Sequence, residues 1–203
     1  MQLASFGQGN DGELFLIARS GEIYGLEESS GSTSFPTKLS MTNIFSDLAN
    51  LTPAPGFIEY DVNVPAHASG AKARRWLAVP NDLGIGFSSI GRWVYPSGSV
   101  LVQHLEMQMD ERDPESMRRL ETRVLVRRAL DWTGFTYRWN ESETDAVLVG
   151  RRETESLLIT GATGGVTSVD YDYLSSTDCL MCHNNTAGFA LGAKTRQLNR
   201  DFA

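Results

Sequence analysis

The stretch "GSVLVQHLEMQM", residues 98–109, decides the fold class of this chain because its residues alternate in the way that a β-strand requires. The two faces of such a strand carry Leu101, Leu105, Met107 and Met109 on one side, and Val100, Val102 and His104 on the other. The first face is expected to be core, which makes Met107 and Met109 packing residues. His104 lies next to two valines and is interpreted as a buried, hydrogen-bonded core histidine.

Segments of the same kind surround this stretch. Each is rich in Val, Thr, Tyr or Trp and is bounded by turn residues: 74–80, 92–109, 118–129, 132–140, 144–150 and 155–161. No helical pattern separates them. The sequence therefore predicts a mainly β fold, an antiparallel β-sandwich or barrel, followed by a short helical C-terminal segment.

Four regions are expected along the chain. Residues 1–28 contain two strands, near residues 14–18 and 22–26, and residues 29–38 form a Ser/Gly/Pro-rich linker. Residues 39–172 form the β-rich domain, and residues 173–203 form the C-terminal segment.

Two details inside these regions are predicted as well. The apolar spacing in "SMTNIFSDLANL" predicts a helix over residues 40–51, with Ser40 as its N-cap. The Gly-rich string "GATGGVTSVDYDY", residues 161–173, is interpreted as a loop.

Composition narrows the classes of function. The chain has 203 residues, a formal net charge of −7 and a pI near 5.0, which argues against a nucleic-acid partner. No apolar run approaches the roughly 20 residues that span a bilayer. The start has no basic and apolar segments of a signal peptide, and both ends are interpreted as cuts in a longer protein.

The string "DCLMCHNN", residues 178–185, contains the main candidate functional residues of the chain. It contains both cysteines of the chain, Cys179 and Cys182, followed directly by His183. C-x-x-C-H is the attachment signature of a c-type haem, in which two thioether links hold the cofactor and the histidine ligates the iron. Ser175, Ser176 or Thr177 is expected to cap a short helix that carries it.

Other interpretations of the string stay open. Half a zinc site, a redox C-x-x-C pair, a disulfide and a chance arrangement are the alternatives. A structural zinc site would need about four ligands, and only His67 and His104 remain as further histidines. A disulfide here would close a very short loop and add little stability.

The remaining haem contacts are expected elsewhere in the chain. The candidates for the second axial ligand are His67, His104, Met41, Met107, Met109 and Met117. His67, in the loop-like "VPAHASGAK", is the preferred histidine, and an open or water-bound position is the alternative. Lys194 and Arg196, near the motif in sequence, are the preferred partners of the haem carboxylates, ahead of Arg74, Arg75 and Arg200.

The segments "FPTKLSMTNIFSDLANLTPAPGFIEYDVNVP", "GAKARRWLAVPND", "FTYRWNESETDAVLV" and "DCLMCHNNTAGFALGAKTRQLNRDF" resemble a bacterial family of secreted haem-motif proteins. The opening "SFGQGNDGELFLIARSGEIYGL" is similar to the last strands of a glucose/sorbosone-dehydrogenase-like propeller. This resemblance implies that the chain joins a propeller end, a β-domain and a first haem motif. It also implies a periplasmic or extracellular location.

The sequence thus favours a haem-binding, c-type cytochrome-like electron-transfer module. It would be accessory to a sugar- or alcohol-oxidising domain rather than an enzyme by itself, with a redox protein or domain as its partner. The alternative is a non-catalytic β-sandwich docking module in which C-x-x-C-H is a structural or metal site. A hydrolase or oxygenase would need a convergent set of catalytic side chains, for which the sequence offers few histidines.

Overall fold

The computed structural model describes residues 2–10, 12–25, 35–65, 69–90, 92–129, 131–199 and 201. The chain divides into two compact units, Met1–Phe35 and Pro36–Ala203. The first unit is an antiparallel sheet in the order β1 (Leu3–Gln8), β2 (Leu14–Ala18), β3 (Ile23–Gly25). The second and third strands match the predicted pair, and the first was not predicted.

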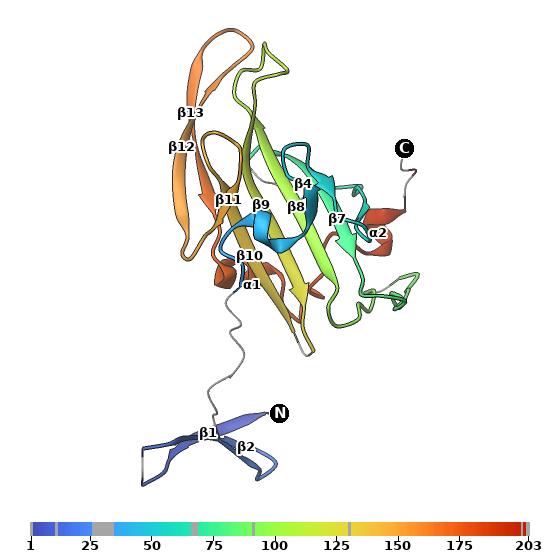
Figure 1. Cartoon of the computed structure of the whole chain (residues 1–203), viewed down its shortest axis with the longest axis vertical. Helices are drawn as coiled ribbons and strands as arrows, with labels where there is room; N and C mark the ends of the chain where they lie inside the picture. Colours follow the sequence, from blue (N-terminus) through green and yellow to red (C-terminus); the bar gives the residue numbers. More distant parts are fainter. Residues whose placement is uncertain are drawn as a thin grey trace. The chain divides into compact units, whose positions relative to one another are not determined.

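The second unit is built on one six-stranded antiparallel sheet, which confirms the mainly β prediction (Figure 1). From one edge to the other its strands are β11 (Ala146–Leu148), β10 (Trp132–Trp139), β9 (Met117–Arg127), β8 (Val100–Gln108), β7 (Lys72–Ala78) and β6 (Ile58–Glu59). Consecutive strands are neighbours, so short turns suffice to connect most of them. The predicted segment 92–109 becomes a strand only from Val100.

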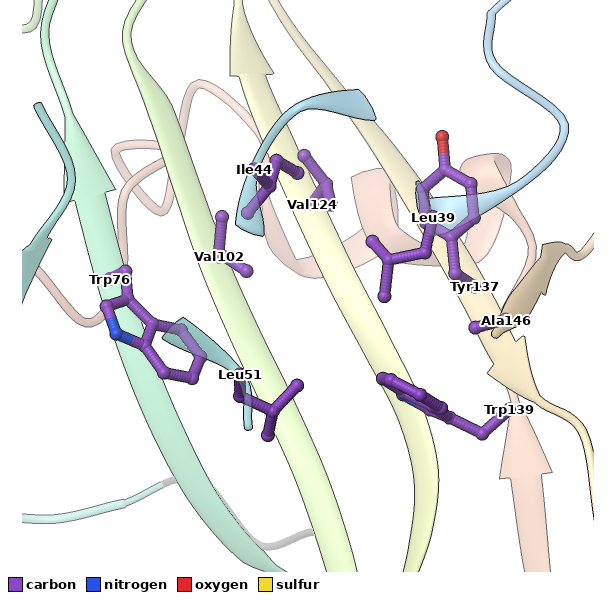
Figure 2. Close-up of a cluster of buried hydrophobic side chains, with 9 residues drawn as sticks. All are labelled: Leu39, Ile44, Leu51, Trp76, Val102, Val124, Tyr137, Trp139 and Ala146. Atoms are coloured by element: carbon purple, nitrogen blue, oxygen red, sulfur yellow. The ribbon is translucent and has the colours of Figure 1, made fainter. Parts of the chain in front are cut away.

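One face of this sheet, called the closed face, is packed with large apolar side chains. Alternate residues of the central strands point to this side, and residues 39–53, the cover segment, lie over them. Figure 2 shows the resulting cluster of Leu39, Ile44, Leu51, Trp76, Val102, Val124, Tyr137, Trp139 and Ala146. His104 lies on the same face, fully buried, with hydrogen bonds to Thr122 and Glu106, as a core histidine should.

The cover segment is not the predicted helix. It forms a short 3-10 turn (Leu39–Thr42) and two small strands, β4 (Phe45–Asp47) and β5 (Thr52–Pro53). Asn43 ends the turn in the left-handed conformation with φ of 57°, and the Asp47 carboxylate accepts hydrogen bonds from the backbone N–H groups of Ala49 and Asn50. Short polar side chains thus compete with helical hydrogen bonding, while the apolar residues still reach the sheet.

The opposite face, called the open face, is covered by the C-terminal part of the chain. This part contains α1 (Ser176–Cys182) and α2 (Thr195–Leu198). The Tyr95 hydroxyl, in the connection before β8, holds it by donating to the Ala193 carbonyl at 2.6 Å, and Tyr95 itself packs against Leu101 and Leu125 of the sheet. No helix within the described ranges is long and apolar enough to cross a membrane.

A two-stranded ribbon packs on the same side, beyond the open face. Its strands are β12 (Glu153–Thr160) and β13 (Val166–Tyr173), and the second lies where a loop was predicted. Leu157, Tyr171 and Tyr173 from the ribbon form a cluster with Met107 and Leu120 from the sheet. Leu120 is the unpaired residue of a β-bulge between β8 and β9, which turns its side chain into this cluster.

Candidate functional site

The helix that carries the cysteines begins with a complete capping box. The N–H of Asp178 donates to the Ser175 hydroxyl at 3.3 Å, and the N–H of Ser175 donates to the Asp178 carboxylate at 2.9 Å. This reciprocal pair satisfies two N–H groups at the helix start and fixes where α1 begins. Of the three predicted caps, Ser175 is the one used, and Cys179 and Cys182 both fall within the helix.

The helix, the open face and the chain near Leu191 enclose a cavity of about 320 Å³. Cys179, Cys182 and His183 all line it. The other lining residues are Tyr60, Arg75, Leu101, Val102, Gln103, Arg123, Val124, Leu125, Gly134, Leu174, Asp178, Leu191 and Gly192. The three residues of the motif are therefore brought together around one hollow.

Cys179 lies directly against the sheet. A Cβ atom at Gly134 would stand 2.5 Å from the Cβ of Cys179, so only glycine lets the helix approach β10 this closely. Burial raises the pKa of the Cys179 thiol, whose sulfur lies 4.0 Å from the hydroxyl of Thr136. Cys182 is exposed, and the two thiols are not joined in a disulfide.

The imidazole of His183 is held by one of its two nitrogens. Nδ1 donates to the backbone carbonyl of Phe189 at 2.5 Å, while Nε2 makes no hydrogen bond to a described residue. A backbone carbonyl accepts only from an N–H, so this contact assigns the hydrogen to Nδ1 and leaves Nε2 with a free lone pair. Burial lowers the pKa of His183, which favours the neutral ring.

A tight loop after the motif places that carbonyl. Asn184 organises it: its side chain accepts from the N–H of Ala187 and donates to the carbonyl of Met181. Arg92 clamps the loop from outside, donating at 2.5 Å to the carbonyls of Asn185 and Thr186. None of these contacts follows from the sequence, since the loop carries no motif and Arg92 is remote from it.

The cavity lies over two parallel rows of side chains on the open face, and all of them line it except the two row ends, Leu77 and Thr136. Hydrogen-bonded register aligns an apolar row of Leu77, Leu101, Leu125 and Gly134, and a polar row of Arg75, Gln103, Arg123 and Thr136. Each row crosses four strands, from β7 to β10. One side of the cavity floor is therefore apolar, and the other is cationic.

The two guanidinium groups in the polar row are held differently. Arg75 contacts the Asp61 carboxylate at 3.3 Å. Arg123 contacts Glu121 at 2.5 Å, a fully buried carboxyl that also accepts from the Tyr171 hydroxyl. The Nε of Arg123 and one oxygen of Glu121 are buried and have no hydrogen-bond partner in the part of the chain that the structure describes. Burial, outweighing the nearby Arg123, raises the pKa of Glu121.

The structure does not bring the predicted carboxylate partners to this cavity. Lys194 and Arg196 line a second hollow, of about 260 Å³, together with Ile90, Arg92, Ala187 and Thr195. His67 lies outside the described residues. His104 is on the closed face, and Met107 is buried against the β12–β13 ribbon, so neither lines the cavity.

Within the described ranges, no group of three or more His, Cys, Asp or Glu side chains is arranged to hold a metal ion by itself. What the site offers is two thiols, one imidazole nitrogen and two guanidinium groups around an amphipathic floor. No family model, curated protein or solved structure matches this chain.

Proposed function

We propose that this chain is a c-type cytochrome module that carries a haem on Cys179, Cys182 and His183 and passes single electrons. The observation that carries the proposal is the state of His183. Its Nδ1 contacts the Phe189 carbonyl, its Nε2 has no hydrogen bond to a described residue, and His183 lines the same cavity as Cys179 and Cys182. A backbone carbonyl on the second nitrogen is the usual way to orient a metal-binding imidazole.

The residues around the cavity fit a tetrapyrrole. Its volume of about 320 Å³ lies at the lower end of ligand pockets, so a large flat cofactor would be only partly covered. Covalent links would suit such a shallow site: the thiols of Cys179 and Cys182 would each add across a vinyl group, with the sulfur on one carbon and the hydrogen on the other. Leu101 and Leu125, which line the cavity, would supply an apolar surface for the ring.

Bound haem would supply reversible one-electron chemistry at its iron. The chain's own residues would hold and shield it. His183 offers Nε2 as the proximal ligand, and the Phe189 carbonyl keeps that ring from turning. Leu101 and Leu125 would exclude water on the sheet side. With less water nearby, the charged oxidised iron centre is less stable, and this shifts the reduction potential of the haem.

The direct test is production in a periplasm that has haem-maturation machinery, followed by a pyridine haemochrome spectrum and intact mass. We expect a thioether-type spectrum and the mass of one added haem. C179A and C182A should each lose one thioether, and H183A should lose the iron ligand. Met181→Ala is the matched control, because Met181 lies between the cysteines and is 73% exposed. Absence of haem from the wild-type chain would contradict the proposal.

The wider setting is part of the same proposal. A covalent haem implies a periplasmic or extracellular location, where attachment takes place. A sugar- or alcohol-oxidising domain as the electron donor and a further redox centre as acceptor are supported by the resemblance of residues 35–65 and 178–202 to secreted haem-motif proteins. In the first unit, the exposed Phe6 and Ile23 suit strands that would pack inside a larger propeller.

A second candidate function is a docking module that carries no haem. It is favoured by four exposed apolar side chains in the connection between β7 and β8: Leu83, Phe87, Ile90 and Val94. Such a group of side chains marks an interaction surface. A chain that folds without taking up haem in the periplasm, and whose contacts with a neighbouring domain weaken on F87S and I90S substitution, would support this candidate over the first.

A further inference from the structure

We infer that Arg123 and Arg75 form a carboxylate-binding pair, which holds the carboxylates of the tetrapyrrole inside the cavity. The inference rests on the proposed function and adds to it the residues that orient the cofactor. It assigns this role to the sheet rather than to Lys194 and Arg196.

Sheet register places the two arginines for such a role. Arg75 on β7 and Arg123 on β9 both pair with Gln103 on the strand between them. Neighbouring strands are about 4.8 Å apart, so the backbones that carry the two arginines are separated by about 10 Å. Both side chains line the cavity that holds the C-x-x-C-H motif. Two forked donors thus stand in one row, on one side of an apolar strip.

Arg123 has donor capacity that the protein does not use. Its Nε is buried and has no acceptor among the described residues, although a buried N–H left unpaired costs free energy. Among the described residues, the guanidinium has a single ion-pair contact, from Nη2 to Glu121, and 27% of the Arg123 side chain is exposed. A carboxylate entering the cavity would accept from the guanidinium edge with the planar geometry that arginine favours.

The surroundings favour an anion as well. Arginine is seldom buried unless it is paired, and here two of them lie beside Leu101 and Leu125 in a chain of net charge −7. Their protein partners, Asp61 and Glu121, do not line the cavity, whereas Arg75 and Arg123 do. Among the described lining residues, Asp178 is the one with a carboxylate, and that carboxylate accepts a hydrogen bond at the start of α1. The cavity therefore presents cationic donors to a ligand.

The test uses the haem-free chain and zinc protoporphyrin IX, compared with its dimethyl ester, which has the same ring but no carboxylates. We expect the wild-type chain to bind the dicarboxylate more tightly, and R123Q to reduce that preference by about tenfold. R75Q should act in the same direction. Arg74→Gln is the matched control, since Arg74 is next to Arg75 but pairs with Glu59 and is part of the opposite face.

A double variant guards against misfolding. R123Q leaves the buried Glu121 carboxyl without its cationic partner, so E121Q/R123Q replaces both ionisable groups by neutral amides and should show the same loss of preference. In haem-loaded protein, R123Q should lower the midpoint potential, because removal of a nearby positive charge favours the ferric form.

The outcomes separate the two proposals. In one outcome the wild-type chain carries covalent haem, but the preference for the dicarboxylate porphyrin is as strong in R123Q, R75Q and E121Q/R123Q as in the control R74Q. The arginine assignment is then overturned and the cytochrome proposal stands. If the chain takes no covalent haem yet prefers the dicarboxylate through Arg123, the carboxylate site stands and the cytochrome proposal fails. Equal binding of acid and ester, or binding of neither, overturns the arginine assignment.

Discussion

The closed and open faces of the six-stranded sheet are made by the same strands, yet they are built for different purposes. The closed face is filled with Trp76, Tyr137 and Trp139 and is sealed by the cover segment. The open face has a glycine, two arginines and a cavity at corresponding places on the same strands. Because side chains alternate along a strand, stability can be concentrated on one side while the other keeps polar groups and space.

The largest expected effect comes from emptying the closed face. Trp76 is fully buried and packs edge-on against Phe45, so W76A should lower the free energy of unfolding by about 3–5 kcal/mol. Leu158→Ala, on an exposed position of the β12–β13 ribbon, should change it by less than about 0.5 kcal/mol. Urea unfolding measures both. Equal, small losses would show that the closed face does not dominate stability.

A smaller loss of stability should follow from a larger residue at Gly134, where α1 contacts the open face. G134A places a Cβ 2.5 Å from that of Cys179, which must push α1 outward, at a cost of about 1–3 kcal/mol. Thiol labelling of Cys179 in a C182S background should become faster, because the helix no longer covers it. Gly150→Ala is the control, since a Cβ there meets nothing within 4 Å. Unchanged labelling in G134A would contradict the tight contact between α1 and β10.

The sequence was most informative where periodicity and local chemistry agree. Alternation over residues 100–108 predicted a strand with both faces defined, and the Ser/Thr string before the motif predicted the start of α1. Where the two disagree, the prediction was wrong. Residues 41–51 have helical apolar spacing, but Asn43 ends the first turn in the left-handed conformation, the Asp47 carboxylate stabilises the next turn, and burial against the sheet decides the outcome.

The candidate site shows the same limit. Cys179, Cys182 and His183 are adjacent in sequence, so their shared chemistry is visible without a structure. The row of Arg75, Gln103 and Arg123 is set by strand register, which single-sequence patterns do not fix. Strand β13 was missed because it begins in a Gly-rich string and carries Ser and Asp on its exposed side, which resembles a loop.

Buried ionisable groups on the two faces should change the stability of the fold with pH in opposite directions. On the closed face the group is His104. Burial lowers its pKa below 6.5, so the folded state favours the neutral ring. The stability it contributes is present above pH 6.5 and is lost as the pH falls through the lowered value, with a slope of up to about 1.4 kcal/mol per pH unit. H104Q should reduce this slope in haem-free protein without abolishing it, because the pKa of His183 is lowered too. A wild-type slope in H104Q would exclude His104 as the source.

Glu121 reports on the open face with the opposite sign. Burial raises its pKa above 4.5, so its stabilising, protonated form is complete below pH 4.5 and is lost as the pH rises through the raised value. E121Q keeps a neutral hydrogen-bonding group at this position, so its stability relative to the wild type should increase as the pH rises above 4.5. Urea midpoints across pH 4–8 measure the difference. A constant difference would mean that Glu121 does not titrate on folding.

The smallest effect is expected from the basic residues that the sequence favoured as haem partners. Lys194 and Arg196 line the second hollow, away from Cys179 and His183, and their charged groups have no partner among the described residues. K194Q/R196Q should therefore change stability by less than about 0.5 kcal/mol and leave porphyrin carboxylate preference as in the wild type. The same change in charge on the open face, R75Q/R123Q, should remove that preference. If instead K194Q/R196Q abolished it and R75Q/R123Q did not, proximity in sequence would have predicted the site better than strand register, and the division between a supporting and a binding face would need to be redrawn.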